Sequence, residues 1–272
     1  MTTTLKQLPI LTHKDHSASS VFTVENLLRE ARRQKSISEG KIPEMCILDP
    51  DGDILQNLLE TGQAHLNPYW ACYHTRLYNF VHEGIEFGIV GCAVGASFAV
   101  LVAEEMFASG CKLLISMTSA GQIVSKGITP YFVLIERALR DEGTSYHYLP
   151  PASYSSMRPE LIQCLQDILK HSQPPVFIGA TWTTDAPFRE TETAITYCQL
   201  EGILGVEMEA AALYAFAEAK GQHVICFAHI TNQMGSVEND FEKGAGGGSL
   251  DALQVISQAA KGWLSCPDLR LK

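Results

Sequence analysis

The sequence lacks the features that would assign it to a membrane, to secretion or to nucleic acid. No apolar run reaches the roughly 18 residues that a membrane-spanning helix needs, and the polar first 20 residues contain no signal-peptide core. Only 20 Lys and Arg stand against 30 Asp and Glu, which gives a formal charge of −10. Such a charge argues against nucleic acid or an anionic membrane as a partner. We therefore expect a cytoplasmic protein.

Motifs for metals and for common cofactors are also missing. The eight cysteines form no C-x-x-C pair, and none of the nine histidines stands four residues from another beside a glutamate. Gly91-x-x-x-Gly95 lacks the third glycine of a dinucleotide fingerprint, and the glycine run from Gly244 to Gly248 is not followed by Lys-Ser/Thr. We expect no metal, no cofactor, buried reduced thiols, and a flexible lid or linker at the glycine run.

Helical and strand-like patterns alternate along the chain, which is long enough at 272 residues to bury a large core. This alternation predicts an α/β fold, a single three-layer αβα domain spanning residues 41–272, preceded by an N-terminal arm and helix in residues 1–40. Residues 118–121 are expected to form a turn and residues 147–157 a long loop. Strands or apolar runs are expected at 45–48, 73–80, 85–90, 112–117, 131–135, 176–182 and 223–230, and helices at 21–34, 54–61, 97–108, 158–171, 190–200 and 249–264.

One stretch, Gly205-Val-Glu-Met-Glu-Ala-Ala-Ala-Leu-Tyr214, places two carboxylates at the start of an alanine-rich helix that ends near Gly221. Acidic side chains at a helix start are favoured by its dipole, so a solvated first turn is the simplest interpretation. The following strand ends at Thr231-Asn232, however, and ligands of α/β sheets gather where strands end. The stretch is therefore also a candidate binding site.

Four segments in this order resemble the purine nucleoside phosphorylase and uridine phosphorylase family: VAEEMFASGCKLLISMTSAGQI, TWTTDAPFRETETA, EGILGVEMEAAALYAFAEAKG and FAHITNQM. The resemblance covers about residues 45–264. It implies a mixed, partly barrel-like central sheet and cleavage of an N-glycosidic bond, with inorganic phosphate as co-substrate. It also implies a nucleoside substrate, a role in purine or uridine catabolism or salvage, and a homo-oligomer, either a dimer or a hexamer.

The resemblance assigns the sugar site to the central stretch. Glu209 would accept hydrogen bonds from the ribose 2′- and 3′-hydroxyls. Met208 would pack under the sugar, and Glu207 would support the turn or the far side of the sugar.

The base site would lie in two other segments. Phe188 would stack on the base, and Asn232 would hold the leaving base. Glu190 resembles the residue that reads a 6-oxopurine, whereas Arg189 would instead bond O4 of uracil. Both bases leave as delocalised anions, so an amide at Asn232 would suffice, and we expect a 6-oxopurine nucleoside or uridine rather than adenosine.

The anion site departs from the family pattern. Ser119, with the N–H groups around Ala120 and Gly121, would face the phosphate or water that attacks C1′, and Gly95 would leave room for it. The family's two phosphate-binding arginines are replaced by glycine at position 52 and serine at position 116, with Arg76 as a candidate replacement.

Loss of both arginines leaves three functions open. The first is phosphorolysis through a variant phosphate site, which we favour. The second is hydrolysis, with Asp49 or Asp51 activating water as in the hydrolase branch of the family. The third is nucleoside binding without catalysis.

Overall fold

The computed structural model describes residues 8–235, 238, 240–266 and 269. Its centre is a ten-stranded mixed sheet, part of which closes on itself. Five strands are hydrogen-bonded in a ring, in the order β5 (Leu113–Gln122), β10 (Val224–Asn232), β6 (Tyr131–Asp141), β8 (Val176–Thr184) and β9 (Gly205–Glu207), which returns to β5. The predicted α/β fold with a partly barrel-like mixed sheet is confirmed.

The other strands extend this ring. Next to β5 the order continues as β1, β4, β3 and β2, while β7 pairs with β6. Their bounds are Met45–Asp49 for β1, His65–Leu66 for β2, Tyr78–His82 for β3, Ile85–Gly91 for β4 and Tyr154–Ser156 for β7.

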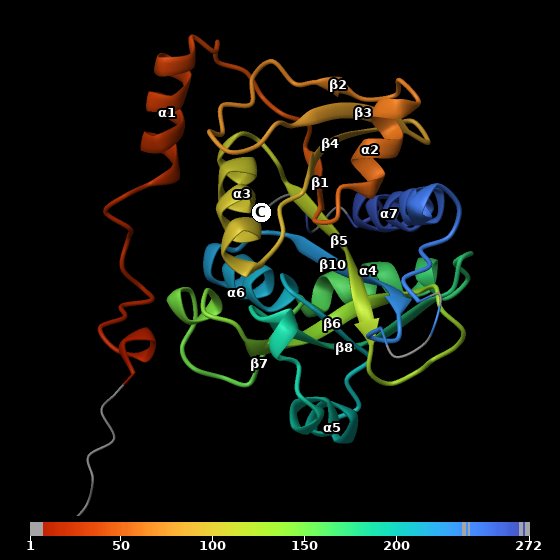
Figure 1. Cartoon of the computed structure of the whole chain (residues 1–272). Coiled ribbons are helices and arrows are strands. Elements are labelled where there is room, and N and C mark those ends of the chain that lie inside the picture. The colour runs from red at the N-terminus through yellow and green to blue at the C-terminus, as the bar shows by residue number, and fades with distance from the viewer. Residues whose placement is uncertain (1–7, 236–237, 239, 267–268, 270–272) are drawn as a thin grey trace, which may run out of the picture.

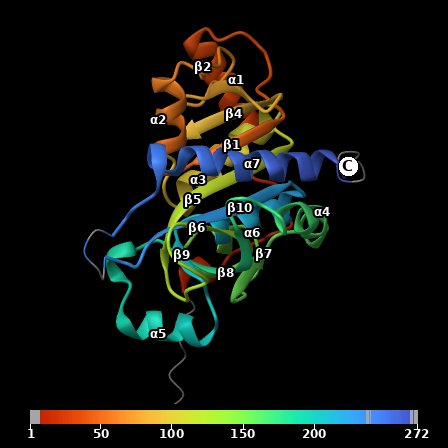
Figure 2. The same cartoon turned by 90° about the vertical axis from the view of Figure 1, so that its right-hand side faces the viewer.

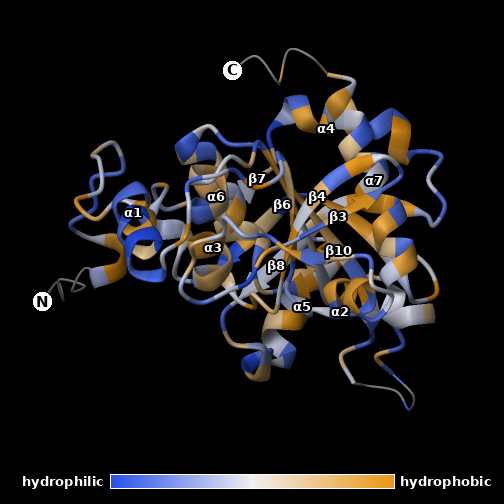
Figure 3. Cartoon of the chain, turned by 90° about the horizontal axis from the view of Figure 1, so that it is seen from above, coloured by the Kyte–Doolittle hydropathy of each residue, from blue (hydrophilic) through white to orange (hydrophobic). Residues whose placement is uncertain are grey.

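Helices cover both faces of the sheet and so complete three layers. Figures 1 and 3 show α3 and α6 on one side and α2 and α7 on the other, and Figure 2 shows α5 apart from them below the barrel. The α-helices are α1 (Val24–Lys35), α2 (Asp53–Glu60), α3 (Ala96–Ala108), α4 (Pro159–Leu169), α5 (Glu192–Leu200), α6 (Ala210–Lys220) and α7 (Ser249–Leu264). Short 3-10 helices lie at Pro9–Leu11, Ser145–His147, Pro187–Arg189 and Ala245–Gly248.

The core strands and helices follow from their composition. All nine residues of β10 are buried, as is usual for a strand covered on both faces. α6 is apolar all round and ends at Gly221, whose φ of 67° is a conformation that favours glycine. The Tyr214 hydroxyl fixes this helix on the sheet, because it donates to the Ile135 carbonyl at 2.5 Å and accepts the Cys226 N–H at 3.0 Å.

Two expectations about local structure are wrong. Residues 118–121 are not a turn but the end of β5, because Gly121 pairs with Val206 of β9 as well as with β10. Residues 147–157 are not a plain loop, since they include β7, which pairs with the second half of β6. In both cases the segment is paired with other strands, which its own composition does not show.

β3 and β4 pair antiparallel and form a hairpin around residues 83–84. Within it, the rings of Phe80 and Phe87 stack with centroids 5.4 Å apart.

The N-terminal segment lies on the outer side of α3 (Figures 1 and 3). Buried Leu28 and Ala31 of α1 pack with Ala71, and the Lys35 ammonium donates to the carbonyls of Ala71 and Cys72 at 3.1 and 2.5 Å. The helix thereby holds the segment that precedes β3.

The expectation of eight reduced cysteines is wrong for one pair. Cys164 of α4 and Cys266, just after α7, form a disulfide across 102 residues of sequence, with Cα atoms 6.3 Å apart. The two helices pack together, a proximity that cysteine spacing alone does not reveal. The other six cysteines are free, five of them buried and Cys92 exposed.

Within the described ranges, no helix is long and apolar enough to span a bilayer. Over the same residues, no group of three or more His, Cys, Asp and Glu is placed to hold a metal ion.

Candidate active site

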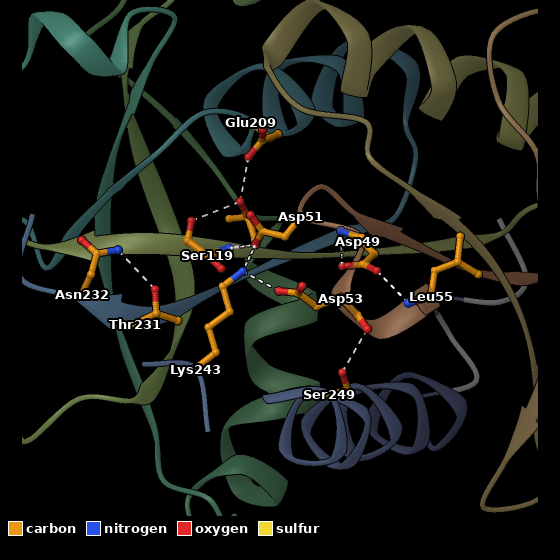
Figure 4. Close-up of polar contacts among 12 residues, drawn as sticks. Asp49, Asp51, Asp53, Leu55, Ser119, Glu209, Thr231, Asn232, Lys243 and Ser249 are labelled. Atoms are coloured by element: carbon orange, nitrogen blue, oxygen red, sulfur yellow. Dashed lines mark hydrogen bonds and ion pairs between the residues drawn. The ribbon is translucent and has the colours of Figure 1, made fainter. Parts of the chain in front are cut away.

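The candidate site lies where three parallel strands end. β1, β5 and β10 are neighbours that run in the same direction, so their C-terminal ends meet at one edge of the sheet. The junction of β9 with α6 and the start of α3 meet this edge, and Figure 4 shows the polar side chains that gather there.

Glu209 is buried at the start of α6, with 1% of its surface exposed. One carboxylate oxygen accepts the Gly95 N–H at 2.7 Å, and the other accepts the Thr118 hydroxyl at 3.0 Å. Burial, followed by the charge of Glu207, raises the pKa of Glu209 to about 8. The carboxylate is therefore held in one orientation by donors from α3 and β5.

Glu207 supports the turn into α6. Its carboxylate accepts the backbone N–H groups of Glu209 and Ala210 at 2.7 Å each, together with the hydroxyls of Thr181, at 3.1 Å, and Thr183. These four bonds occupy its oxygens and satisfy N–H groups at the helix start. Of the two roles considered for Glu207, this geometry favours support of the turn. Met208, which lies between the two glutamates, is half-buried.

At the end of β5, where an anion site is expected, a side chain of the protein itself is bound. The Ser119 N–H donates to Oδ2 of Asp51 at 2.9 Å, and the Lys243 ammonium lies 3.5 Å from the same oxygen (Figure 4). Lys243 also forms an ion pair with Asp53 at 2.5 Å. Sequence analysis missed Lys243 and Asp53; the only signal was a lysine directly before the glycine run.

Asp49, the other candidate hydrolytic base, bonds to the start of α2 rather than to Ser119 or Lys243. Its carboxylate accepts the N–H groups of Gly52 and Leu55, at 3.2 and 2.9 Å, and so caps the start of α2. It is 2% exposed, and burial is the main cause that raises its pKa to about 7. Of these two aspartates, Asp51 is the one whose carboxylate accepts the Ser119 N–H.

A cavity of about 20 Å³ lies between these loops. This volume holds about one water molecule. Its lining includes Asp49, Asp51, Asp53, Thr118, Ser119, His229 and Lys243.

The positions of the two missing arginines do not suit arginine in this chain. Gly52 has φ 84°, and a Cβ there would lie 2.7 Å from the Cys92 sulfur. Ser116 is buried within β5, 1% exposed. Arg76, the candidate replacement, lies in the segment that reaches a neighbouring subunit in relatives; it is exposed before β3 and makes no hydrogen bond or ion pair with the described residues of its own chain, so its role stays a prediction.

Asn232 ends β10 at the same edge, opposite Gly121. Its side-chain oxygen accepts the Met234 N–H at 2.9 Å, and its amide nitrogen donates to the Thr231 hydroxyl at 3.2 Å. Ala120 is buried, whereas Gly121 is partly exposed between Asn232 and the β9 strand.

The three other base-site candidates lie between β8 and α5. Phe188 is 99% exposed and Arg189 is exposed. Glu190 is half-buried, and burial raises its pKa. Among the described residues, none of the three is hydrogen-bonded to the Glu209 and Asp51 clusters.

Comparison with known proteins agrees with this architecture. The family described as the phosphorylase superfamily matches residues 44–261. A protein named guanosine phosphorylase from Halorubrum lacusprofundi is 22% identical over 194 residues, 68% of this chain and 76% of that protein. A purine nucleoside phosphorylase (DeoD-type 1) from Shewanella oneidensis is 25% identical, over 56% of this chain and 66% of its own length.

Solved structures show the same fold. A uridine phosphorylase from Vibrio fischeri superposes with a TM-score of 0.69 at 21% identity, covering 81% of this chain and 92% of that one. A purine nucleoside phosphorylase from Toxoplasma gondii, in complex with immucillin-H, gives 0.67 at 16% identity, covering 85% and 93%. The match over residues 44–261 places this chain in the phosphorylase superfamily, a family of enzymes.

Proposed function

We propose that this protein cleaves the N-glycosidic bond of a ribonucleoside with inorganic phosphate, giving the free base and ribose 1-phosphate. The observation that carries the proposal is the adjacency of two sites on β5. Thr118 donates to Glu209, and the next residue, Ser119, donates to an anionic group. A sugar bound at Glu209 would thus present C1′ to an anion bound at Ser119.

Glu209 suits the sugar because a buried carboxylate fixed by two donors can accept hydrogen bonds from two neighbouring hydroxyls without rearranging. Such a pre-oriented group binds the oxocarbenium-like transition state better than the flexible ground state. Met208, half-buried beside it, would contact the sugar face.

Asn232 would hold the leaving base through its amide. A 6-oxopurine or uracil departs as a delocalised anion that hydrogen bonds stabilise, whereas adenine requires a proton donor. We therefore propose inosine, guanosine or uridine as substrates. When the base binds, Phe188 and either Arg189 or Glu190 would move to contact it.

The test is product analysis with inosine, guanosine, uridine and adenosine, each with and without phosphate. Ribose 1-phosphate formed only with phosphate supports the proposal, and rapid cleavage of adenosine would contradict the role of Asn232. Tight nucleoside binding without any cleavage would instead indicate a binding protein.

Hydrolysis is the second candidate, and one observation favours it. The Asp51 carboxylate already accepts the Ser119 N–H, and it lines a cavity that holds about one water molecule. Free ribose formed at the same rate with and without phosphate would establish this alternative.

A further inference from the structure

Two donors converge on a single oxygen of Asp51. The Ser119 N–H and the Lys243 ammonium lie 2.9 and 3.5 Å from Oδ2. They come from β5 and from the segment before α7, while Asp51 lies between β1 and α2. Three chain segments thus form a pocket for one anionic oxygen, at present a carboxylate oxygen.

Lys243 is the only cation among the described residues that line this cavity. Burial alone would lower the pKa of Lys243, but the hydrogen bond and charge of Asp53, with the charge of Asp51, outweigh burial and raise it. His229, stacked on Phe132, lines the same cavity and stays neutral because burial and then the charge of Lys243 lower its pKa to about 4.

The two aspartates are held differently. Asp53 is the first residue of α2, and its carbonyl accepts the Ser249 hydroxyl at 3.1 Å, which ties it to α7. Asp51 lies in the turn before α2, and among the described residues its side chain bonds only to Ser119 and Lys243. Asp51 can therefore rotate away while Asp53 keeps Lys243 in place.

We infer that Lys243 is the phosphate-binding cation of this enzyme, and that Asp51 competes with phosphate for Lys243 and for the Ser119 N–H. This inference rests on the proposed phosphorolysis. Phosphate displaces the Asp51 carboxylate, takes over both donors and lies one residue along β5 from the donor to Glu209. A single lysine on a distant loop thus replaces the arginines that positions 52 and 116 do not accommodate.

The experiment measures the KM for phosphate, the KM for the nucleoside and the rise in melting temperature with phosphate alone. The variants are Lys243→Met, Lys243→Arg and Asp51→Asn. The matched control is Lys261→Met, which removes the distant ion pair of Lys261 with Glu83 at 2.8 Å.

Lys243→Met should raise the KM for phosphate about 30-fold, as expected for loss of a charge-assisted contact, and should abolish the phosphate-induced rise in melting temperature. Lys243→Arg should keep most of the phosphate affinity. Asp51→Asn, which removes the competing charge, should lower the KM for phosphate about 10-fold. The KM for the nucleoside should change little, and Lys261→Met should match the wild type throughout.

Failure of the inference differs from failure of the proposed function. If ribose 1-phosphate is the product but Lys243→Met leaves both phosphate readouts unchanged, the inference is wrong and phosphorolysis stands. If free ribose forms regardless of phosphate and Asp51→Asn abolishes turnover, the proposed function itself is wrong. The melting temperatures of Lys243→Met and Lys243→Arg without phosphate are compared. This comparison separates a folding defect in Lys243→Met from a loss of phosphate binding.

Discussion

The backbone N–H of Gly95 donates to the carboxylate of Glu209 at 2.7 Å, although the two residues are 114 positions apart. Gly95 has φ 91° and begins α3, so an N–H at the positive end of a helix dipole faces a buried acid. The sequence suggested that Gly95 leaves room for an anion, which stays a prediction. The structure adds that its backbone N–H orients the carboxylate of Glu209.

Gly95→Ala should therefore reduce kcat/KM by more than its loss of stability alone would explain. Gly95 combines φ 91° with ψ 148°, a conformation that is essentially restricted to glycine, so another residue costs on the order of 1–3 kcal/mol and would shift the N–H from Glu209. Gly84→Ala is the matched control, since Gly84 has φ 78° and likewise has no atom within 4 Å of an added Cβ. Steady-state assays should show kcat/KM reduced only in Gly95→Ala, and thermal melts measure the loss of stability in each variant.

Glu209→Gln should lower kcat/KM at least about 100-fold, because an amide donates a hydrogen bond where the ribose hydroxyls require an acceptor. The fold should remain intact. The folded-state pKa of Glu209 is raised to about 8, so its stabilising contribution is complete below about pH 4.5 and lost as pH rises through 8. The variant should thus melt higher than wild type at pH 9, and retained activity would refute the site assignment.

The pH dependence of wild-type kcat/KM should rise to a plateau with a midpoint near 8. The ionised form of Glu209 is the acceptor, and its pKa in the free enzyme is about 8. The same profile measured on Asp49→Asn is the control. A midpoint that disappears in this variant would assign the titration to Asp49.

Asp49→Asn should flatten the pH dependence of stability between about pH 4 and 7. Because burial raises the pKa of Asp49 from 3.8 to about 7, the folded state binds more protons in this window and wild-type stability falls as pH rises. At about 1.4 kcal/mol per pH unit, the whole effect is at most about 4 kcal/mol. Urea unfolding of both proteins at pH 5 and pH 8 measures it, and parallel curves would contradict the prediction.

The fold, and the position of the candidate sugar site at the start of a helix, could be predicted from the sequence because their signals are local. Glu207, Met208 and Glu209 stand in one run at a strand-to-helix junction, and the buried strands are continuous apolar stretches. The same local reasoning failed for residues 118–121, whose small polar composition is typical of a turn. Their pairing with β9 and β10 was not visible in that composition.

The ion pair of Lys243 with Asp53 could not be predicted for a related reason. Lys243 and Asp53 are 190 positions apart and meet only because α7 packs beside α2. No spacing rule links a lysine before a glycine run to an aspartate at a distant helix start. The two missing arginines were visible in the sequence, whereas their replacement was visible only in three dimensions.

The disulfide between Cys164 and Cys266 also encloses the segments that carry the candidate base site and Lys243. A protease that cuts once at exposed Phe188 would therefore leave two pieces joined covalently. Such a nicked chain would migrate as one band on a non-reducing gel and as two bands after reduction. Limited proteolysis thus reports the cross-link directly, and it allows the segment around Phe188 to be severed without releasing α7 from α4.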